Sequence, residues 1–462
     1  GAFYSSEKQS TTARLTDNNV LCLYCGYFVD VPDGILQPFR EGSGFLGGKV
    51  SVPPAWQTFD INQLIAFFES PQAAAARDAA LGLPPGTTAA VLAASNGYEV
   101  HVQPSSSQIK EEIASLYAEV NLEGTIGGRR WGLTVGTRYV HTATTALGIS
   151  QPLQDLVSSG DPTLYTTVLG PPTTVSQKNT YDNVLPSLDF RLNLSNDLIV
   201  RLAASKTLTR PPLGALSPRM VIGTTRPGNL QASSGNPNLK PFTSRNLDLS
   251  LEWYYQKNGF VTLGLFHKDV NNFLVNTVEH RALPIADSGN LFNGDPVFEV
   301  SLQDNLKSAK VKGLELAVQH SFDWLPGFWR GFGIGVNATL VDSNAKLNIS
   351  DVTQTFALEG LGDSYNVIGF YEEGPFEVRV AWNRRARFLQ TAVGFGGEPT
   401  FVDPFEQIDA RASFAINRNF SVFVEGVNIA NARTKKVGRF ANQILLLEET
   451  GPRYAIGVRA EF

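Results

Sequence analysis

The chain has 462 residues, of which 18% are charged, 10% are aromatic and 42 are glycine. A formal net charge of −5 without a sizeable basic cluster argues against a nucleic-acid-binding protein. The sequence contains no run of about 18 apolar residues, so it predicts no membrane-spanning helix.

The first 110 residues contain one expected strand followed by a long irregular segment. Residues 1–15 start with GAFYSSEKQS, which is polar and typical of a strand, so we expect a processed precursor or the interior of a longer chain. Residues 16–110 break the strand pattern, and 59–86 favour two short helices, with Asp60 as an N-cap and Pro71 at the break between them. We predict that 16–110 form one large loop, and loops of that length are usually functional.

The two cysteines of the chain, Cys22 and Cys25, form a Cys-x-x-Cys pair in this loop. Such a pair can be a redox motif, half of a zinc site or a small disulfide. A zinc site needs two more ligands, whereas the five histidines are scattered. A thioredoxin-like role needs a βαβ setting, which the flanking sequence does not provide. We therefore predict a local disulfide without metal, in an oxidising compartment.

From Leu116 onward, apolar and polar residues alternate in runs of roughly 9–11 residues, the length of a tilted strand that crosses a bilayer. In 247–255, for example, leucine, tryptophan and tyrosine occupy the odd positions and mostly polar residues the even ones. A period of two is that of a strand with one apolar and one polar face. Thirteen such runs and the strand near 1–15 predict about 14 strands.

The connections between these strands alternate in length, and this alternation indicates the architecture. In an outer-membrane barrel the periplasmic turns are short and the extracellular loops are long, and closure pairs every backbone group that the hydrocarbon cannot solvate. We therefore predict an all-β fold, an antiparallel transmembrane β-barrel in which 16–110 is a large extracellular loop. The short turns are 126–130, 195–197, 256–259, 322–331, 372–375 and 417–419, and the long connections are about 142–183, 209–245, 275–307, 343–363, 389–406 and 430–452.

The most basic short stretch, WNRRARF at 382–388, lies at the outer end of an expected strand. Its side chains can contact an anion or a sugar acid at the rim, or phosphates of lipopolysaccharide, or solvent alone. We favour lipopolysaccharide or solvent, because the rim faces anionic headgroups. The candidate rim contacts are Trp382, Arg384, Arg385 and Arg387.

Motifs of catalysis are missing from the sequence: it has no GxSxG, no HExxH and no phosphate-binding P-loop. An outer-membrane protease or lipase would need His, Asp and Ser clustered at the rim, and the histidines are scattered. We therefore predict no enzyme activity and no cofactor.

Several long stretches resemble the barrel of TonB-dependent outer-membrane receptors, in particular a subfamily abundant in Caulobacter- and Xanthomonas-like bacteria. Members of this family have 22 strands, an N-terminal plug domain and, before the plug, a short TonB-contacting segment called the TonB box. The resemblance implies that 1–15 are a barrel strand and 111–462 the C-terminal part of the barrel, with the plug absent. The similar stretches are 185–218, 235–255, 264–274, 311–327, 365–389, 407–432 and 453–462.

The resemblance also implies a function in the outer membrane of a Gram-negative bacterium. In the family, a scarce or large substrate such as an oligosaccharide or a siderophore-like compound binds outside, and the TonB–ExbB–ExbD complex supplies energy for its uptake. A passive porin-like channel and a surface binding module are the alternatives. In the last strand, Tyr454 and Phe462 mark the two ends, and a terminal aromatic resembles the signal read by the outer-membrane barrel assembly machinery. An ordinary lipid-facing Phe at the interface is the other interpretation.

Overall fold

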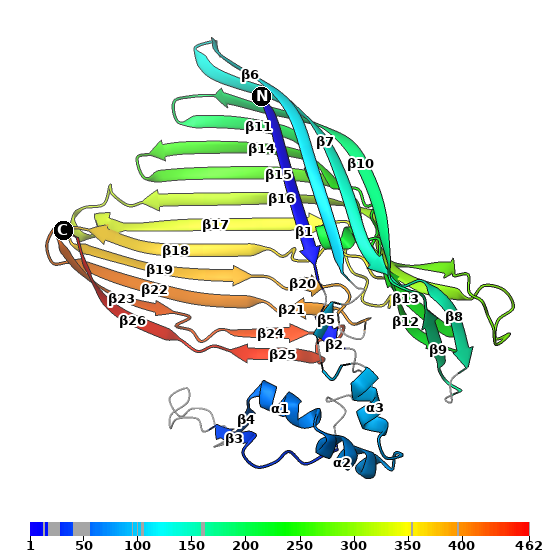
Figure 1. Cartoon of the computed structure of the whole chain (residues 1–462). Helices are drawn as coiled ribbons and strands as arrows, with labels where there is room; N and C mark the ends of the chain where they lie inside the picture. Colours follow the sequence, from blue (N-terminus) through cyan, green and yellow to red (C-terminus); the bar gives the residue numbers. More distant parts are fainter. Residues whose placement is uncertain are drawn as a thin grey trace. The chain divides into compact units, whose positions relative to one another are not determined.

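Figure 1 shows the computed structural model of the chain, which divides into two units: 1–9 with 108–148 and 152–462, and 10–107 with 149–151. The structure describes all residues except 13, 17–27, 40–55, 95, 99, 103–105, 159–161, 353, 395–396 and 462.

The first unit is built on one large, curved, antiparallel sheet (Figure 1), in which fourteen strands of the described residues follow one another in chain order. This confirms the predicted fold class. In the described residues, β1 and β26 lie at the two ends of the strand order and do not pair with each other. The strands are β1 (Ala2–Thr11), β6 (Ser107–Ile126), β7 (Arg129–Ser150), β10 (Thr173–Asn193), β11 (Leu198–Thr209), β14 (Phe242–Gln256), β15 (Gly259–Ala282), β16 (Val297–Ser321), β17 (Phe332–Ser343), β18 (Ser364–Glu373), β19 (Phe376–Arg385), β22 (Phe405–Ala415), β23 (Phe420–Val427) and β26 (Arg453–Ala460).

One face of this sheet is apolar, and the described residues leave most of it exposed. The register aligns leucines across five neighbouring strands, from β11 to β17, and most of them are exposed. On β26, the side chain of Ile456 is 86% exposed. The opposite face is polar, and there Arg201 donates to Glu252 at 2.7 Å. An uncovered apolar band beside a polar face is what a strand between lipid and a hydrated lumen requires. The aligned leucines are Leu202, Leu249, Leu265, Leu314 and Leu340.

The connections alternate in length as predicted. Gly127 and Gly128, both with positive φ, turn β6 into β7 within two residues, and equally short turns join β14 to β15 and β18 to β19. The long connections are not plain polar loops, however. Much of 275–307 is strand, because β15 and β16 continue as one long hairpin, and other long connections form small sheets of their own. The small sheets contain β8 (Leu153–Ser158), β9 (Tyr165–Leu169), β20 (Phe388–Thr391), β21 (Thr400–Val402), β24 (Arg433–Val437) and β25 (Ile444–Glu449). The hairpin of β12 (Met220–Arg226) and β13 (Asn229–Ser234) instead joins the main sheet through β16, and the 3-10 turns are Leu213–Leu216 and Gly327–Gly331.

The described part of the second unit contains three helices and two strand pairs. The two expected helices are confirmed: Asp60 accepts hydrogen bonds from the first turn of α1 (Ile61–Phe68), and Pro71 opens α2 (Pro71–Leu81). The sequence reasoning missed α3 (Thr87–Ala94). The buried carboxylate of Asp78 on α2 accepts hydrogen bonds from the amide and the hydroxyl of Thr88 on α3, and these bonds join the two helices. The hydrogen bond from the Thr88 hydroxyl has the largest effect, and together these donors hold the pKa of the Asp78 carboxyl below its usual range. The strand pairs are β2 (Arg14–Thr16) with β5 (Val100–Val102), and β3 (Leu36–Phe39) with β4 (Trp56–Phe59).

Among the described residues, the helices are too short to carry an apolar stretch that would cross a bilayer.

Candidate functional site

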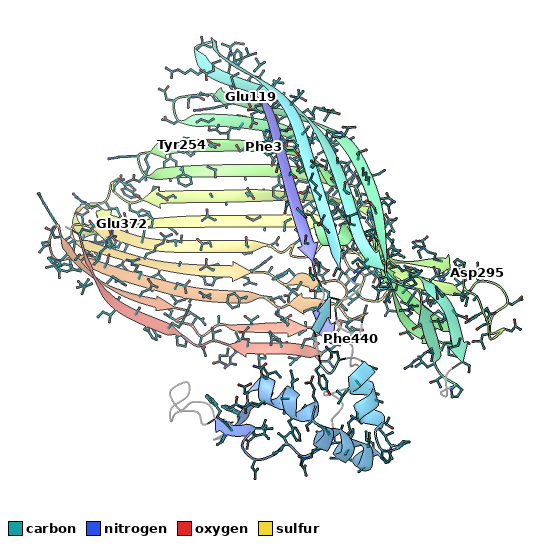
Figure 2. All side chains as sticks on the ribbon, in the orientation of Figure 1. Phe3, Glu119, Tyr254, Asp295, Glu372 and Phe440 are labelled. Carbon is teal, nitrogen blue, oxygen red and sulfur yellow. The ribbon has the colours of Figure 1, made fainter. Side chains whose placement is uncertain are left out.

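The two ends of the large sheet differ in what they carry. Figure 2 shows Tyr254 and Glu372 at the end with the short turns, and Phe440 and Asp295 at the opposite end, among the long connections. The long connections hold two ordered features, a folded loop module and a pocket, and we describe both as the candidate site.

The loop module is built by β8, β9, β12, β13 and the outer part of the β15–β16 hairpin. Its core is apolar, and Phe298 and Val300 on β16 are completely buried in it. Residues 231–233 of β13 pair in parallel with 299–301 of β16, so the β12–β13 hairpin is joined to the main sheet, whereas β8 and β9 form a sheet of their own. The buried core residues are Leu153, Leu156, Leu230, Ala232, Leu283, Phe298 and Val300.

A buried carboxylate, Asp155, fastens the β8–β9 hairpin to the loop that follows β15. It accepts hydrogen bonds from the amide and hydroxyl of Ser288 and from the amide of Leu156. Beside it, the amide of Ala286 donates to the carbonyl of Gln154 at 2.8 Å. The Ser288 hydroxyl above all, and then the surrounding amides, hold the pKa of Asp155 below its usual range, so the carboxylate is charged at neutral pH.

The GNPNLKP turn at 235–241 fixes the connection between β11 and β14 onto β16. The side-chain amide of Asn236 donates to the carbonyl of Gln303 at 3.1 Å. Asn305 accepts from the Lys240 amide at 2.7 Å and donates back to the Lys240 carbonyl at 3.0 Å. These two reciprocal hydrogen bonds take the place of strand pairing in a segment whose prolines have no amide N–H to donate.

A pocket of about 580 Å³, called the loop pocket below, lies among the three connections β17–β18, β19–β22 and β23–β26. Its walls are largely apolar, and Phe440 is an exposed member of them (Figure 2). The apolar wall is Leu347, Leu358, Leu361, Phe388, Leu389, Phe401 and Phe440, and the charged lining residues are Asp342, Lys346, Arg387 and Arg439.

The charges of the loop pocket are unevenly satisfied. Lys346 pairs with Asp342 at 2.7 Å, and Arg387 lies 4.5 Å over the ring of Phe401. Arg439 is only 8% exposed. One of its terminal nitrogens donates to the carbonyl of Ile349, but its Nε makes no hydrogen bond with any described atom. That Nε lies 3.4 Å from Glu398 Oε2, so the buried guanidinium sits between a backbone carbonyl and a carboxylate.

The sequence model of a known family, described as TonB dependent receptor-like, beta-barrel, matches residues 61–429, well over half of the chain. The chain belongs to the TonB-dependent receptor β-barrel family. Members of this family are receptors and transporters and not enzymes. No curated protein sequence matches the chain.

Solved TonB-dependent receptors share the fold. The ferric-catecholate import receptor Fiu of E. coli matches with a TM-score of 0.53 and 15% identity, over 79% of this chain and 46% of Fiu. The ferric enterobactin receptor of Pseudomonas aeruginosa, solved with enterobactin, matches with a TM-score of 0.50 and 14% identity, over 79% of this chain and 56% of that receptor. The chain thus spans about half the length of these receptors.

In the structure of this TonB-dependent receptor chain, the four predicted rim residues have different partners. Trp382 lies on β19 opposite Val367 and Ile408 in the ladder. Arg384 pairs with Glu406 at 2.8 Å, and Arg385 lies 3.8 Å over the ring of Phe388 and donates to the Gly360 carbonyl. Of the four, Arg387 lines the loop pocket.

The remaining sequence candidates are placed as follows. Tyr454 is exposed on β26, opposite Gly426. Cys22, Cys25 and Phe462 lie outside the described residues. Among the described residues, no group of three or more His, Cys, Asp or Glu side chains is arranged to hold a metal ion.

Sequence reasoning missed Lys346 and Arg439, which the fold brings to the pocket of Arg387 from 41 positions before it and 52 positions after it. No local pattern could have found them, because an isolated Arg or Lys in a polar connection has no periodicity to distinguish it. Phe298 and Val300 did carry a signal, since VFEVSL at 297–302 alternates like a strand although it lies in a long connection.

Proposed function

We propose that the protein is a TonB-dependent active transporter of the outer membrane of a Gram-negative bacterium, and that this chain supplies the C-terminal region of its barrel. The observation that carries this proposal is the fourteen-stranded antiparallel sheet with an uncovered apolar face, in a chain that matches the barrel family over 61–429. An apolar face of this extent would be unstable in water and suits lipid.

The substrate we propose is a scarce or large compound, either siderophore-like or an oligosaccharide. The siderophore-like class is supported by the printed ligands of the two solved receptors, one of which imports ferric catecholates while the other binds enterobactin. The oligosaccharide class is supported by the resemblance to the Caulobacter- and Xanthomonas-type subfamily.

In the proposed arrangement, 1–15 are a barrel strand, 16–110 a large extracellular loop and 111–462 the C-terminal part of a 22-stranded barrel. The plug domain and the TonB box lie outside this chain, and the TonB–ExbB–ExbD complex contacts the receptor through them. The long connections face outward, which puts the loop module and the loop pocket where an external substrate arrives.

Uptake by the full-length receptor tests the proposal. A radiolabelled candidate substrate should accumulate in cells that express the receptor, and accumulation should disappear when the tonB gene is deleted or a protonophore is added. Equal uptake with and without TonB would refute active transport and indicate a passive porin-like channel. Binding at the cell surface without any uptake would instead indicate a surface binding module.

We also propose that the exposed basic side chains at the end of β19 contact lipopolysaccharide. Arg384 is exposed and Arg385 has a guanidinium that only one carbonyl engages in the described residues, while Trp382 lies on the same strand. Guanidinium groups bind phosphates in a forked geometry, which supports this assignment. Arg384→Gln combined with Arg385→Gln should make cells more sensitive to large hydrophobic antibiotics, and unchanged sensitivity would contradict it.

The C-terminal aromatic residue is proposed to serve recognition by the barrel assembly machinery. Tyr454, Ile456 and Val458 are exposed along β26, so the strand offers a continuous apolar face. Deletion of Phe462 should lower the amount of receptor in the outer membrane and leave the substrate affinity of the assembled molecules unchanged. Normal assembly of the deletion variant would refute this role.

A further inference from the structure

We propose that the loop pocket binds an amphipathic organic anion: a carboxylate, sulfonate or phosphate carried on a compact apolar body. The inference rests on the proposed function only for the position of the pocket on the outer side of the membrane. Its chemistry is derived from the pocket itself.

The size and walls of the pocket fit a small organic molecule. A volume of about 580 Å³ lies within the range of ligand sites, roughly 300–1,000 Å³. Leu347 and Leu358 come from one connection, Phe388 and Phe401 from the next, and Phe440 from the third. Walls of this kind remove apolar surface from water, so the body of the ligand is apolar.

The charges that reach the pocket favour an anion. The lining carries three cationic side chains and one carboxylate, Asp342. That carboxylate is already bridged by two lysines, Lys346 at 2.7 Å and Lys312 at 3.9 Å. Asp403 is likewise shared by Arg387 and Lys435, and Arg439 pairs with Glu398. In the described ion pairs of the pocket, five cationic side chains thus share three carboxylates, and an anionic ligand would balance the surplus of positive charge. The three cationic lining residues are Lys346, Arg387 and Arg439.

Arg439 supplies the specific contact. It is 8% exposed and its Nε lies 3.4 Å from Glu398 Oε2, yet the geometry between them is not that of a hydrogen bond. Neither atom has a hydrogen-bond partner among the described residues. Both atoms are sealed from solvent, so a ligand in the pocket would meet the terminal nitrogens of the Arg439 guanidinium, one of which donates to the Ile349 carbonyl. A carboxylate or phosphate oxygen accepts from a guanidinium strongly.

Arg387 is a second, adjustable anchor on the opposite connection. Its Nε lies 3.7 Å from Asp403, and Lys435 competes for the same carboxylate at 3.1 Å. Because Lys435 can hold Asp403 alone, Arg387 can turn toward a ligand without leaving a carboxylate unpaired. The face of Phe401 supports the guanidinium in either case.

The test uses matched probes on the receptor that contains this chain, reconstituted in phosphatidylcholine nanodiscs. The probes are 1-naphthoate, its neutral isostere 1-naphthylmethanol, and inorganic phosphate, each measured by equilibrium dialysis. We expect saturable binding of one naphthoate per receptor, with naphthylmethanol and phosphate each weaker by about tenfold or more, because loss of a charge-assisted hydrogen bond costs about that factor. Equal binding of naphthoate and naphthylmethanol would overturn the proposal, because the pocket would then be merely apolar.

Variants locate the site. Arg439→Gln and Arg387→Gln should each weaken naphthoate binding by about tenfold, whereas Arg384→Gln, three positions away and outside the lining, should leave it unchanged. Ala441→Trp adds a bulky ring to an exposed lining residue, keeps every charge and should block all binding. Equal effects of the variants at 384 and 387 would overturn the site. If Arg439→Gln does not assemble, the exposed positions Arg387 and Ala441 still decide the question.

The outcome is separable from that of the proposed function. TonB-dependent uptake by a receptor that does not bind naphthoate would refute this inference alone. Naphthoate binding that depends on Arg439, in a receptor whose uptake is independent of TonB, would refute active transport alone.

Discussion

Replacement of Phe298 by Ala tests whether the loop module is a true hydrophobic core outside the membrane. Phe298 is completely buried in the module, and in the ladder its backbone pairs with Arg281 on β15. Removal of a buried phenyl ring costs about 3–5 kcal/mol in well-packed sites. Since about 1.4 kcal/mol is a factor of ten, the population of molecules with an open module should rise by roughly 100-fold or more.

Trypsin cleavage at Arg281 in whole cells measures this opening, because the peptide bond is protected while β15 and β16 are paired. When opening is fast compared with cleavage, the cleavage rate follows the open population. The control is Val297→Ala: this neighbour is 53% exposed on the same strand, so its removal should change the rate little. Heat-modifiable migration of the barrel should be the same in both variants. Cleavage of Phe298→Ala at the rate of Val297→Ala would refute the reasoning.

Three further predictions concern the module, the topology and the cysteines. Because hydrogen bonds depress the pKa of Asp155, the stability that this carboxylate contributes is full above the ordinary carboxyl pKa and is lost as pH falls through the lowered value. Protection of the module amides from hydrogen exchange, corrected for the intrinsic pH dependence of exchange, should therefore be constant above about pH 5 and fall below about pH 4. Asp155→Asn should be less protected at pH 7 and should lose this pH dependence. Cysteine-reactive label added to intact cells should reach single cysteines placed in 142–183 but not in 195–197, and label at the short turn would reverse the topology. Mass spectrometry of the unreduced protein should find a Cys22–Cys25 disulfide. Two free thiols or one bound zinc ion would contradict this prediction.

The sequence was sufficient to predict the strands of the sheet because each is specified locally. A run such as 247–255 alternates with period two along its whole length, and no distant residue is needed to see that one face is apolar. The short turns could be predicted equally well, since glycine pairs such as Gly127 and Gly128 supply the positive φ that a two-residue turn requires. The N-cap Asp60 and the break at Pro71 are local signals of the same kind.

The folded connections could not be predicted in this way, because their order comes from contacts between segments far apart in the chain. Asp155 meets Ser288 across 133 positions, and Asn236 meets Gln303 across 67. Each of these side chains is typical of a solvated loop when its own neighbourhood is considered alone. Arg439 is the sharpest case, since nothing in VGRFAN indicates that this arginine is buried beside Ile349.

The two ends of the strand order bear on what completes the fold in a membrane. In the described residues β1 pairs with β6 alone and β26 with β23 alone, so each presents one row of unpaired amides and carbonyls. Water can satisfy such a row, but hydrocarbon cannot, and each unsatisfied group costs several kcal/mol there. The exposed apolar residues of β26, led by Ile456, are suited to hydrocarbon all the same. An edge that is apolar in its side chains and unpaired in its backbone is stable in neither solvent alone. We therefore propose that additional strands of the receptor pair with both β1 and β26, as a 22-stranded barrel would provide, so that the lipid-facing side chains meet lipid only after every backbone group has a partner.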